Sequence, residues 1–438
     1  MITKEIVNKI IGIKENYELP IKLMEIILDK EKRGRVFGEF LKYENDLSFD
    51  WFTNYFQEEH GDRDSLKQDF TPACICEIIE RMNETYDSNG DICAGTGGLT
   101  IRNWNSNKDA YYYCEEISSR ALPILLFNMS IRGINGQIVQ GDALTGKVVQ
   151  IYTLERNGMY SDITTDIPIH PQKFQSIIMN PPYSLSWEAG KQYEKDERFV
   201  GYAIPPKAKA DYGFVLHGLS KLRDDGALFA VLPHGVLFRG SAEKVIREKL
   251  IKNNLIDAVI GMPDKLFLNT NIPVCILVIK KGRKAKDILF VDASKDFIKG
   301  GKQNFMSEDH ISRIVRVYQS RETIEKYSNL ATFQQLEENE YNLNIPRYVD
   351  TFEREPVPDI LETIKEIREI DHEIYKAEQN LLGMMKKLTG TNEEEQKEVE
   401  KETKEYEDYI KEKGNRAKNT RITDKQITLM DYFSNAVV

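Results

Sequence analysis

Helix-like and strand-like segments alternate between residues 73 and 330, and this alternation constrains the fold more than any other feature of the sequence. Short runs of aromatic and β-branched residues predict strands, and amphipathic segments that end near glycine predict helices. Such a sequence builds βαβ units, so we expect an α/β fold with a doubly wound, mainly parallel sheet. Ligands of these sheets bind at the carboxyl ends of the strands, and residues that directly follow predicted strands are therefore the candidates for a functional site.

The same pattern predicts where individual elements lie. Strands are expected at residues 110–116, 136–142, 174–180, 227–233, 256–262 and 273–281, and helices at 75–82, 118–133, 211–226 and 243–254. We expect Ser118 or Ser119 to cap the helix at 118–133, Gly133 to close it, and Gly226 to end the helix that follows. The predicted domains are an N-terminal helical domain (1–60), an α/β domain (61–350) that begins with a polar connection at 59–72, and a C-terminal helical arm (351–438).

Composition excludes some functional classes. The 438-residue chain has a net charge of −10, which argues against nucleic-acid binding through bulk charge but not through a local basic groove. Its apolar runs are shorter than a membrane span and its N-terminus lacks the apolar core of a signal peptide, so we expect a cytoplasmic protein with no membrane partner. The five cysteines include no Cys-x-x-Cys pair, which favours free thiols and no metal site.

The last 88 residues form a distinct segment with 21 acidic and 15 basic side chains. An apolar stripe with helical spacing runs along it, formed by Ile364, Ile367, Ile374, Leu381, Met385 and Leu388. A second charged stretch follows the break at Gly390. We interpret the segment as a helical hairpin or coiled-coil arm that needs a partner, with a solvated helical tail as the alternative.

Glycines and acids follow the first predicted strands. In "DICAGTGGLTI" (91–101), Gly95, Gly97 and Gly98 let the backbone approach a ligand closely. Glu115 and Glu116 end the next strand, 24 and 25 positions after Asp91, which is near the spacing at which an acid binds a ribose in dinucleotide folds. Asp142 closes the third strand. The alternative for each acid is an ordinary solvated turn or strand end.

A phosphate-binding loop is disfavoured. Gly141, Gly146 and Lys147 match its skeleton, but Val148 stands where the magnesium-binding Ser or Thr is required.

"NPPY" (180–183) directly follows the predicted strand 174–180. The Asn180 amide accepts hydrogen bonds from an amino group, and Pro181 and Pro182 fix the backbone so that neighbouring carbonyls add further acceptors. Tyr183 offers a face on which a planar base stacks. Two acceptors on one amino group orient its lone pair towards an electrophile, which is catalysis by positioning without a metal.

At these residues the chain resembles the amino-group (N6-adenine) DNA methyltransferases, and more narrowly the modification (M) subunit of type I restriction–modification systems. "QDFTP" (68–72), "DICAGTGG" (91–98) and "NPPY" are similar to the cofactor-binding, glycine and catalytic motifs of that family. The narrower resemblance comes from "DERFVGYAIPPKAKADYGFVLHGL" and "GALFAVLPHGVLFRGSAEKVIREKLI". The resemblance as a whole covers about residues 66–350.

The resemblance implies S-adenosyl-L-methionine as the cofactor. The residues that match its cofactor-binding motifs are Gln68, Phe70, Thr71, Pro72, Asp91, Gly95, Thr96 and Gly97. Glu116 would bind the ribose hydroxyls, with Glu115 as the competitor, and Asp142 would face the adenine of the cofactor. Asn180, Pro181, Pro182 and Tyr183 would hold an adenine that is flipped out of double-stranded DNA, with Asn180 also next to the cofactor.

The resemblance also implies partner subunits. Nothing after residue 346 resembles a sequence-reading domain, so we expect a separate specificity (S) subunit, docked on the C-terminal arm. A second copy of the chain and a restriction subunit are further implied partners. Two other functions stay open, a methyltransferase acting on protein glutamine or RNA, and a non-catalytic scaffold of a DNA-defence complex. Cytosine C5 chemistry is disfavoured because it needs a Pro-Cys nucleophile, which the chain lacks.

Overall fold

The computed structural model describes residues 2–53, 55–56, 70–165, 167–170, 173–268, 270–351 and 360–419, with the side chains of 360, 361 and 414–419 excepted. The chain forms two compact units, Met1–Phe352 and Glu353–Val438. The predicted connection, with Gln68, lies outside the described residues as far as residue 69.

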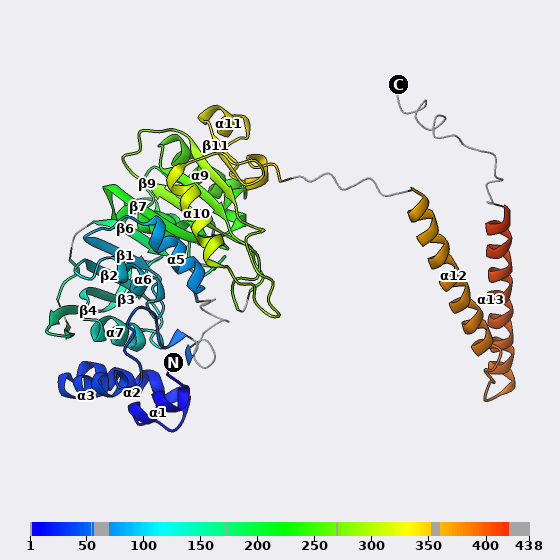
Figure 1. Ribbon diagram of the computed structural model, residues 1–438, viewed down its shortest axis with the longest axis horizontal. Helices are drawn as coiled ribbons and strands as arrows, with labels where there is room; N and C mark the ends of the chain where they lie inside the picture. Colours follow the sequence, from blue (N-terminus) through cyan, green and yellow to red (C-terminus); the bar gives the residue numbers. More distant parts are fainter. Residues whose placement is uncertain are drawn as a thin grey trace. The chain divides into compact units, whose positions relative to one another are not determined.

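An eleven-stranded sheet forms the centre of the first unit as far as the chain is described (Figure 1). Its strands are ordered β11–β10–β8–β9–β7–β6–β1–β2–β3–β4–β5 from edge to edge. They are β1 (Ser88–Ile92), β2 (Tyr111–Glu116), β3 (Asn135–Asp142), β4 (Lys147–Asn157), β5 (Tyr160–Thr165), β6 (Phe174–Met179), β7 (Leu222–Pro233), β8 (Ile256–Gly261), β9 (Val274–Lys280), β10 (Ile288–Asp292) and β11 (Ser328–Ala331).

Most strands of this sheet run in one direction. β7, β6, β1, β2 and β3 are consecutive parallel neighbours, and β8 pairs in parallel with β10. Strands β4, β9 and β11 run the opposite way. The loops that follow the parallel strands therefore all lie at one side of the sheet, which we call the carboxyl edge. The predicted doubly wound, mainly parallel α/β fold is confirmed.

Helices cover both faces of the sheet, because the central strands are apolar on both sides. In β7, Leu228, Ala230 and Leu232 pack towards one face, and Phe229 and Val231 pack towards the other. The first face is covered by α8 (Asp211–Lys221), α9 (Ser241–Lys252) and α11 (Phe333–Glu338). The second is covered by α5 (Ala73–Met82), α6 (Gly98–Ser106), α7 (Leu122–Ile131) and α10 (Glu308–Ser320), with α5 and α10 side by side (Figure 1). Short 3-10 turns are η1 (Asn16–Glu18), η2 (Lys191–Tyr193), η3 (His234–Leu237) and η4 (Ile345–Arg347).

The N-terminal helices share a core with the second face. They are α1 (Lys4–Ile11), α2 (Leu19–Leu28) and α3 (Lys30–Phe40). Phe37 and Phe40 of α3 pack edge-on against Phe127 of α7, with ring centroids 5.0 and 4.9 Å apart. Edge-to-face aromatic packing of this kind stabilises a core beyond its buried area alone.

Two predicted element boundaries are wrong. The helix expected at 211–226 ends at Lys221, because Leu222 already pairs with Phe174 of β6 as the first residue of β7. Ser118 or Ser119 was expected to cap the amino end of α7, but the residue at the N-cap position is Ala121. Ser118 instead accepts from the Ala121 amide through its hydroxyl, within the turn that leads into the helix. Gly133 does close this segment, with φ at +63°.

The second unit consists of two long helices in its described part, α12 (Ile360–Met385) and α13 (Glu393–Asn419). Leu382 and Ile410 are buried between them, and ion pairs Lys386–Glu407 (3.3 Å) and Lys413–Glu378 (2.5 Å) join them. Among the helices of the described residues, none combines the length and the hydrophobicity needed to span a membrane.

Candidate active site at the carboxyl edge

One cavity at the carboxyl edge brings together loops from four parallel strands. It holds about 1080 Å³ of space between atoms, counting its open mouth. Residues after β1, β2, β3 and β6 line it, together with Phe70 and Thr71 from the segment before α5. The glycine loop and Asn180 therefore share one cavity, as the sequence predicted.

The glycine loop connects β1 to α6. Gly95 and Gly97 have φ of +59° and +96°, which an L side chain adopts only with strain. A Cβ on Gly97 would also lie 2.9 Å from Cδ1 of Leu125 in α7, so that leucine would have to shift to admit a side chain. Gly95 and Gly98 line the cavity without side chains that would narrow it.

Asp91 does not line this cavity. Its carboxylate points beneath α6, where it accepts from the Thr100 hydroxyl at 2.6 Å. Burial raises the pKa of Asp91 to about 7, helped by the nearby charge of Glu116 and opposed by the Thr100 bond. The contact with the cofactor that the resemblance implies for Asp91 stays a prediction; in this structure the Asp91 carboxylate supports the helix that follows the glycine loop. Gly97, which faces α7, and Pro72, at the start of α5, are likewise absent from the cavity wall in the described residues.

Glu115 and Glu116 both line the cavity, but their surroundings differ. Glu116 accepts from the backbone amides of Gly95 and Ser118, each at 2.7 Å, so it is joined directly to the glycine loop. Burial raises its pKa. Because successive residues of a strand face opposite sides of a sheet, Glu115 points the other way.

Glu115 belongs to a buried charged cluster. It accepts from the Tyr113 hydroxyl at 2.5 Å and lies 2.7 Å from His217 Nε2 and 3.1 Å from Lys221. Burial opposes its ionisation, yet His217, Lys221 and Tyr113 together lower the pKa of Glu115 to about 2. Arg198 only donates hydrogen bonds, so its contact with His217 Nδ1 at 3.2 Å leaves Nε2–H as the donor to Glu115.

Arg198 also shapes the wall of the cavity that follows β3. Its guanidinium donates to the carbonyls of Ala143 and Leu144, both in the cavity wall, at 2.6 and 3.0 Å. Asp142 accepts from the Leu144 amide at 2.9 Å and is also part of the wall. The loop after β3 is therefore held in place from both ends.

The glycine loop is anchored from the N-terminal helical region. The Asp50 carboxylate accepts from the hydroxyls of Thr96 and Thr53 at 2.5 and 2.9 Å, and from the Asn128 amide of α7 at 2.8 Å. Thr53 and Thr96 both line the cavity. This anchor was not predicted from the sequence, because a single aspartate 46 positions from Thr96 carries no local signal.

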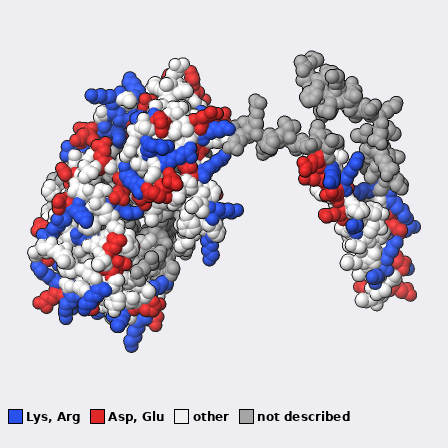
Figure 2. Space-filling view, in the orientation of Figure 1, with Lys and Arg blue, Asp and Glu red and all other residues white. Residues whose placement is uncertain are grey.

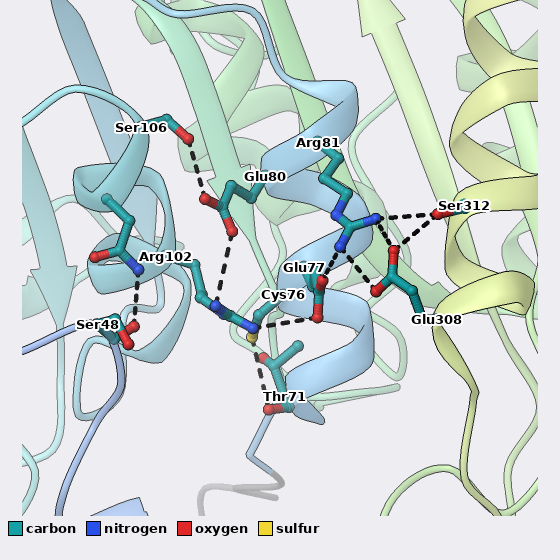
Figure 3. A network of polar contacts seen from close by, with 11 residues as sticks. Ser48, Thr71, Cys76, Glu77, Glu80, Arg81, Arg102, Ser106, Glu308 and Ser312 are labelled. Atoms are coloured by element: carbon teal, nitrogen blue, oxygen red, sulfur yellow. Dashed lines mark hydrogen bonds and ion pairs between the residues drawn. The ribbon is translucent and has the colours of Figure 1, made fainter. Parts of the chain in front are cut away.

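A network of polar contacts fixes the helix that follows Thr71 (Figure 3). Arg102 of α6 pairs with Glu77 and Glu80 of α5 at 3.3 and 4.0 Å, and Arg81 of α5 pairs with Glu308 at the start of α10 at 2.5 Å. The Cys76 thiol donates to the Thr71 carbonyl at 3.7 Å. Because α6 starts in the glycine loop and α5 starts next to Thr71, the network holds these two walls of the cavity in register.

Thr71 in turn orients the Asn-Pro-Pro-Tyr corner. Asn180 follows β6 and donates from Nδ2 to the Thr71 hydroxyl at 2.9 Å, while its Oδ1 accepts from the Tyr183 hydroxyl at 2.7 Å. Pro181 and Pro182 complete the corner in the cavity wall. The amide oxygen of Asn180 is thereby fixed as an acceptor on the side of Tyr183.

A buried charged group supports the corner from behind. Ser184 has φ at +51°, and its amide donates to Asp211 at 2.8 Å. Asp211 also accepts from Arg239 at 2.8 Å, and Arg239 bonds Glu243 and the Ser184 hydroxyl. The strained backbone directly after Tyr183 is thus stabilised by the buried carboxylate of Asp211, which is itself paired with Arg239.

Of the predicted site residues, the cavity wall contains Phe70, Thr71, Gly95, Thr96, Glu116, Asp142, Asn180, Pro181, Pro182 and Tyr183. Further wall residues were not predicted from the sequence; they include Thr53, Cys93, Leu99, Ile117, Leu144, Leu185 and Phe214. Most of these are apolar residues whose only signal is their place directly after a strand or at the start of a helix.

The wall is suited to a cationic ligand with a planar ring. It contains the carboxylates of Glu115, Glu116 and Asp142 and, among its described residues, no Lys, Arg or His. Phe70, Ile117 and Leu144 supply apolar surface. The charge fits the sulfonium and ammonium groups of S-adenosylmethionine and disfavours phosphate-bearing cofactors. In the part of the chain that the structure describes, no three His, Cys, Asp or Glu side chains are grouped to bind a metal.

Comparison with known proteins identifies the class and then the family. The solved methyltransferase subunit of a type I restriction–modification system from Streptococcus thermophilus superposes with a TM-score of 0.61 and is 30% identical, over 79% of each chain. The fold is therefore that of the S-adenosylmethionine-dependent methyltransferases. The family model described as N-6 DNA Methylase matches residues 46–356, and the chain belongs to this family.

Two curated relatives carry the same description. The methylase subunit of the type I restriction enzyme MpnII from Mycoplasma pneumoniae is 32% identical over 298 residues, which is 64% of this chain and 53% of the relative. The MjaVIII methylase subunit from Methanocaldococcus jannaschii is 25% identical over 361 residues, which is 78% of this chain and 59% of the relative. The chain thus spans only a little more than half the length of these relatives.

Proposed function

We propose that the chain is the modification subunit of a type I restriction–modification complex and transfers a methyl group from S-adenosylmethionine to N6 of an adenine flipped out of double-stranded DNA. The observation that carries this proposal is the shared cavity, in which a corner built to hold an amino group faces the glycine loop and a cation-compatible, acidic wall. The family membership and the relatives named above support the substrate.

Each wall of the cavity has a separate role in this proposal. Phe70, Thr96 and the glycine loop hold the cofactor, which supplies an electrophilic methyl group on a positively charged sulfur. Glu116 accepts from the ribose hydroxyls, since its carboxylate is joined to the glycine loop, whereas Glu115 already accepts from His217 and pairs with Lys221. Asp142 accepts from the adenine amino group of the cofactor.

The corner positions the second reactant. Oδ1 of Asn180 and the carbonyl of Pro181 accept from the two N–H groups of the target amino group, and Tyr183 stacks on the base. With both N–H groups held by acceptors, the nitrogen lone pair is directed at the methyl group, and the rate gain comes from orientation and electrostatics. No side chain needs to act as a strong base, because the amino group loses its proton to water after it has become cationic.

We further propose that the C-terminal helices bind the specificity subunit. Along α12, Ile364, Ile367, Ile374 and Leu381 are 41–52% exposed in the chain by itself, and Leu388, just after the helix, is 58% exposed. Large apolar side chains repeated on one helical face at this exposure favour a partner surface.

Mapping modified bases tests the proposal directly. We expect N6-methyladenine at one sequence in DNA from cells that express the chain with its partner subunits, and none when Asn180→Ala replaces the wild type. Calorimetry with S-adenosylmethionine on the purified chain separates the alternatives. Cofactor binding without any methylated DNA would favour a protein-glutamine or RNA substrate, and absent cofactor binding would favour a scaffold.

A further inference from the structure

A hairpin at the carboxyl edge stands next to the corner that holds the target base. We call residues 294–306 the basic hairpin; it follows β10 and precedes α10. Ile298 and Phe305 exchange backbone hydrogen bonds of 2.7 and 3.0 Å across it. Its turn requires glycine, since a Cβ on Gly300 would lie 1.9 Å from the Gln303 carbonyl oxygen.

The hairpin is tied to the catalytic corner through the loop after β8. Its Asn304 donates from the backbone to the Lys265 carbonyl at 2.8 Å, and Gln303 donates to the Leu266 carbonyl at 2.6 Å. The next residue, Phe267, packs edge-on against Tyr183 with ring centroids 5.9 Å apart. Tyr183, Phe267 and the hairpin therefore form one continuous wall beside the cavity.

The charge on the exposed side of this wall is positive. Lys295, Lys299 and Lys302 are exposed in the hairpin, and Lys265 is exposed beside it. Its one acidic residue, Asp296, is 5% exposed and accepts from the Tyr327 hydroxyl at 2.6 Å.

Over much of the visible surface of the first unit, acidic and basic side chains are intermixed (Figure 2). Two carboxylates near the hairpin are engaged within the chain. Asp264 accepts from Asn304 at 3.3 Å, and Glu308 pairs with Arg81. Ile298 and Phe305 of the hairpin are 56% and 57% exposed.

We propose that the basic hairpin, with Lys265, binds the phosphate backbone of duplex DNA beside the extruded adenine; this rests on the proposed function. A base held at Asn180 stays linked to its own strand, so phosphates on either side of it must pass the rim of the cavity. The cofactor half of the rim is acidic, and the hairpin lies at the other half, after β8 and β10. Its lysines supply the sequence-independent part of DNA affinity, which a chain with a net charge of −10 cannot obtain from bulk charge.

The test uses the full-length chain with Lys299→Ala and Lys302→Ala together, and a fluorescein-labelled duplex of about 30 base pairs whose sequence is immaterial for binding to phosphates. Anisotropy titrations at several salt concentrations give the slope of log affinity against log salt. We expect the slope to fall in magnitude by about 2, near 1 for each lysine that no longer neutralises a phosphate, with about tenfold weaker binding near 0.1 M salt. If the double Ala variant does not fold, Lys299→Gln with Lys302→Gln replaces it, because this variant keeps polar side chains. We expect the same change in slope for it.

The matched control is Lys284→Ala with Lys286→Ala. These lysines are also exposed. They lie in the loop between β9 and β10, on the side of the sheet opposite the carboxyl edge, so their loss should leave the slope of log affinity against log salt unchanged. The proposal is overturned if the hairpin and control variants give equal slopes, or if the wild type does not bind the duplex. If the wild type binds DNA with the expected slopes but neither binds cofactor nor methylates adenine, the proposed function fails and the hairpin assignment stands.

Discussion

The Asn180 side-chain amide donates to the Thr71 hydroxyl at 2.9 Å, although the two residues lie 109 positions apart in the chain. This bond connects the Asn-Pro-Pro-Tyr corner to the segment before α5, which also lines the cavity. Because Nδ2 is used in it, Oδ1 is left on the side where the target amino group is proposed to bind. The orientation of the acceptor therefore depends on a residue that does not belong to the corner.

The first prediction concerns this pair. Asn180→Ala removes the acceptor, and we expect methyl transfer to fall at least ~100-fold, comparable to the loss of one transition-state hydrogen bond. S-adenosylmethionine affinity, measured by calorimetry, should change less than about threefold. Thr71→Val keeps the shape but removes the hydroxyl, so we expect a loss of about tenfold that Thr71→Ser restores. Equal activities of the Val and Ser variants would show that the hydroxyl does not orient Asn180.

The second prediction separates the two adjacent glutamates. Glu116→Gln should weaken S-adenosylmethionine binding about tenfold, because it removes an acceptor for the ribose and places an amide opposite backbone donors. Glu115→Gln should leave affinity within about threefold but destabilise the fold by roughly 1–3 kcal/mol, since buried His217 and partly exposed Lys221 lose their charged partner. Calorimetry and thermal unfolding of both variants check this. The reverse pattern would assign the ribose to Glu115.

Much of the site could be predicted because its residues are adjacent in sequence. The glycine loop, the strand-end acids and the Asn-Pro-Pro-Tyr corner each follow a recognisable strand, and parallel strands bring their carboxyl ends together. The side chains that hold them were missed for the opposite reason. Asp50 anchors Thr96 from 46 positions away, and Arg239 reaches Asp211 across 28 positions, so neither interaction leaves a local pattern.

The difference between local sequence patterns and long-range contacts also bears on the errors in the predicted secondary structure. The hairpin formed by β4 and β5 was not predicted, although Asn157 and Gly158 stand at its turn, with Gly158 at φ +69°. The helix–strand boundary at Lys221 was placed too late because "LRDDG" carries a strong turn signal. Tertiary pairing of Leu222 with Phe174 overrides that signal and extends β7 towards its amino end.

The third prediction uses the buried Asp91. Its folded-state pKa of about 7 lies above that of an unfolded aspartate, so the folded state binds more protons between about pH 4 and 7. The free energy of unfolding should therefore fall as the pH rises through this range, by up to roughly 4 kcal/mol, and level off above it. Asp91→Asn, which stays neutral and still accepts from Thr100, should lack this decline.

Denaturant unfolding at pH 5 and pH 8 measures the difference between wild type and Asp91→Asn. Asp224→Asn is the matched control, because the side chain of Asp224 is 99% exposed and the same substitution there removes no buried carboxyl. If the free energy of unfolding changes with pH in the same way for wild type and Asp91→Asn, ionisation of Asp91 does not destabilise the folded protein.

The fourth prediction concerns the apolar stripe of α12. Ile367 and Ile374 are 52% and 42% exposed and lie seven positions apart, on one face of the helix. Replacing both with aspartate places charges on that face, so we expect the chain to lose co-purification with a co-expressed specificity subunit. Cofactor affinity should be unchanged, because the helix belongs to the second compact unit and contributes no residue to the cavity wall.

Glu366→Ala with Glu373→Ala provides the control for the stripe. The two glutamates have the same seven-residue spacing, one position before each isoleucine, and therefore project from a different side of α12. This variant should still bind the specificity subunit. Retained binding by the isoleucine variant would place the docking surface elsewhere on the chain, whereas loss in both variants would indicate that α12 binds through more than the apolar stripe.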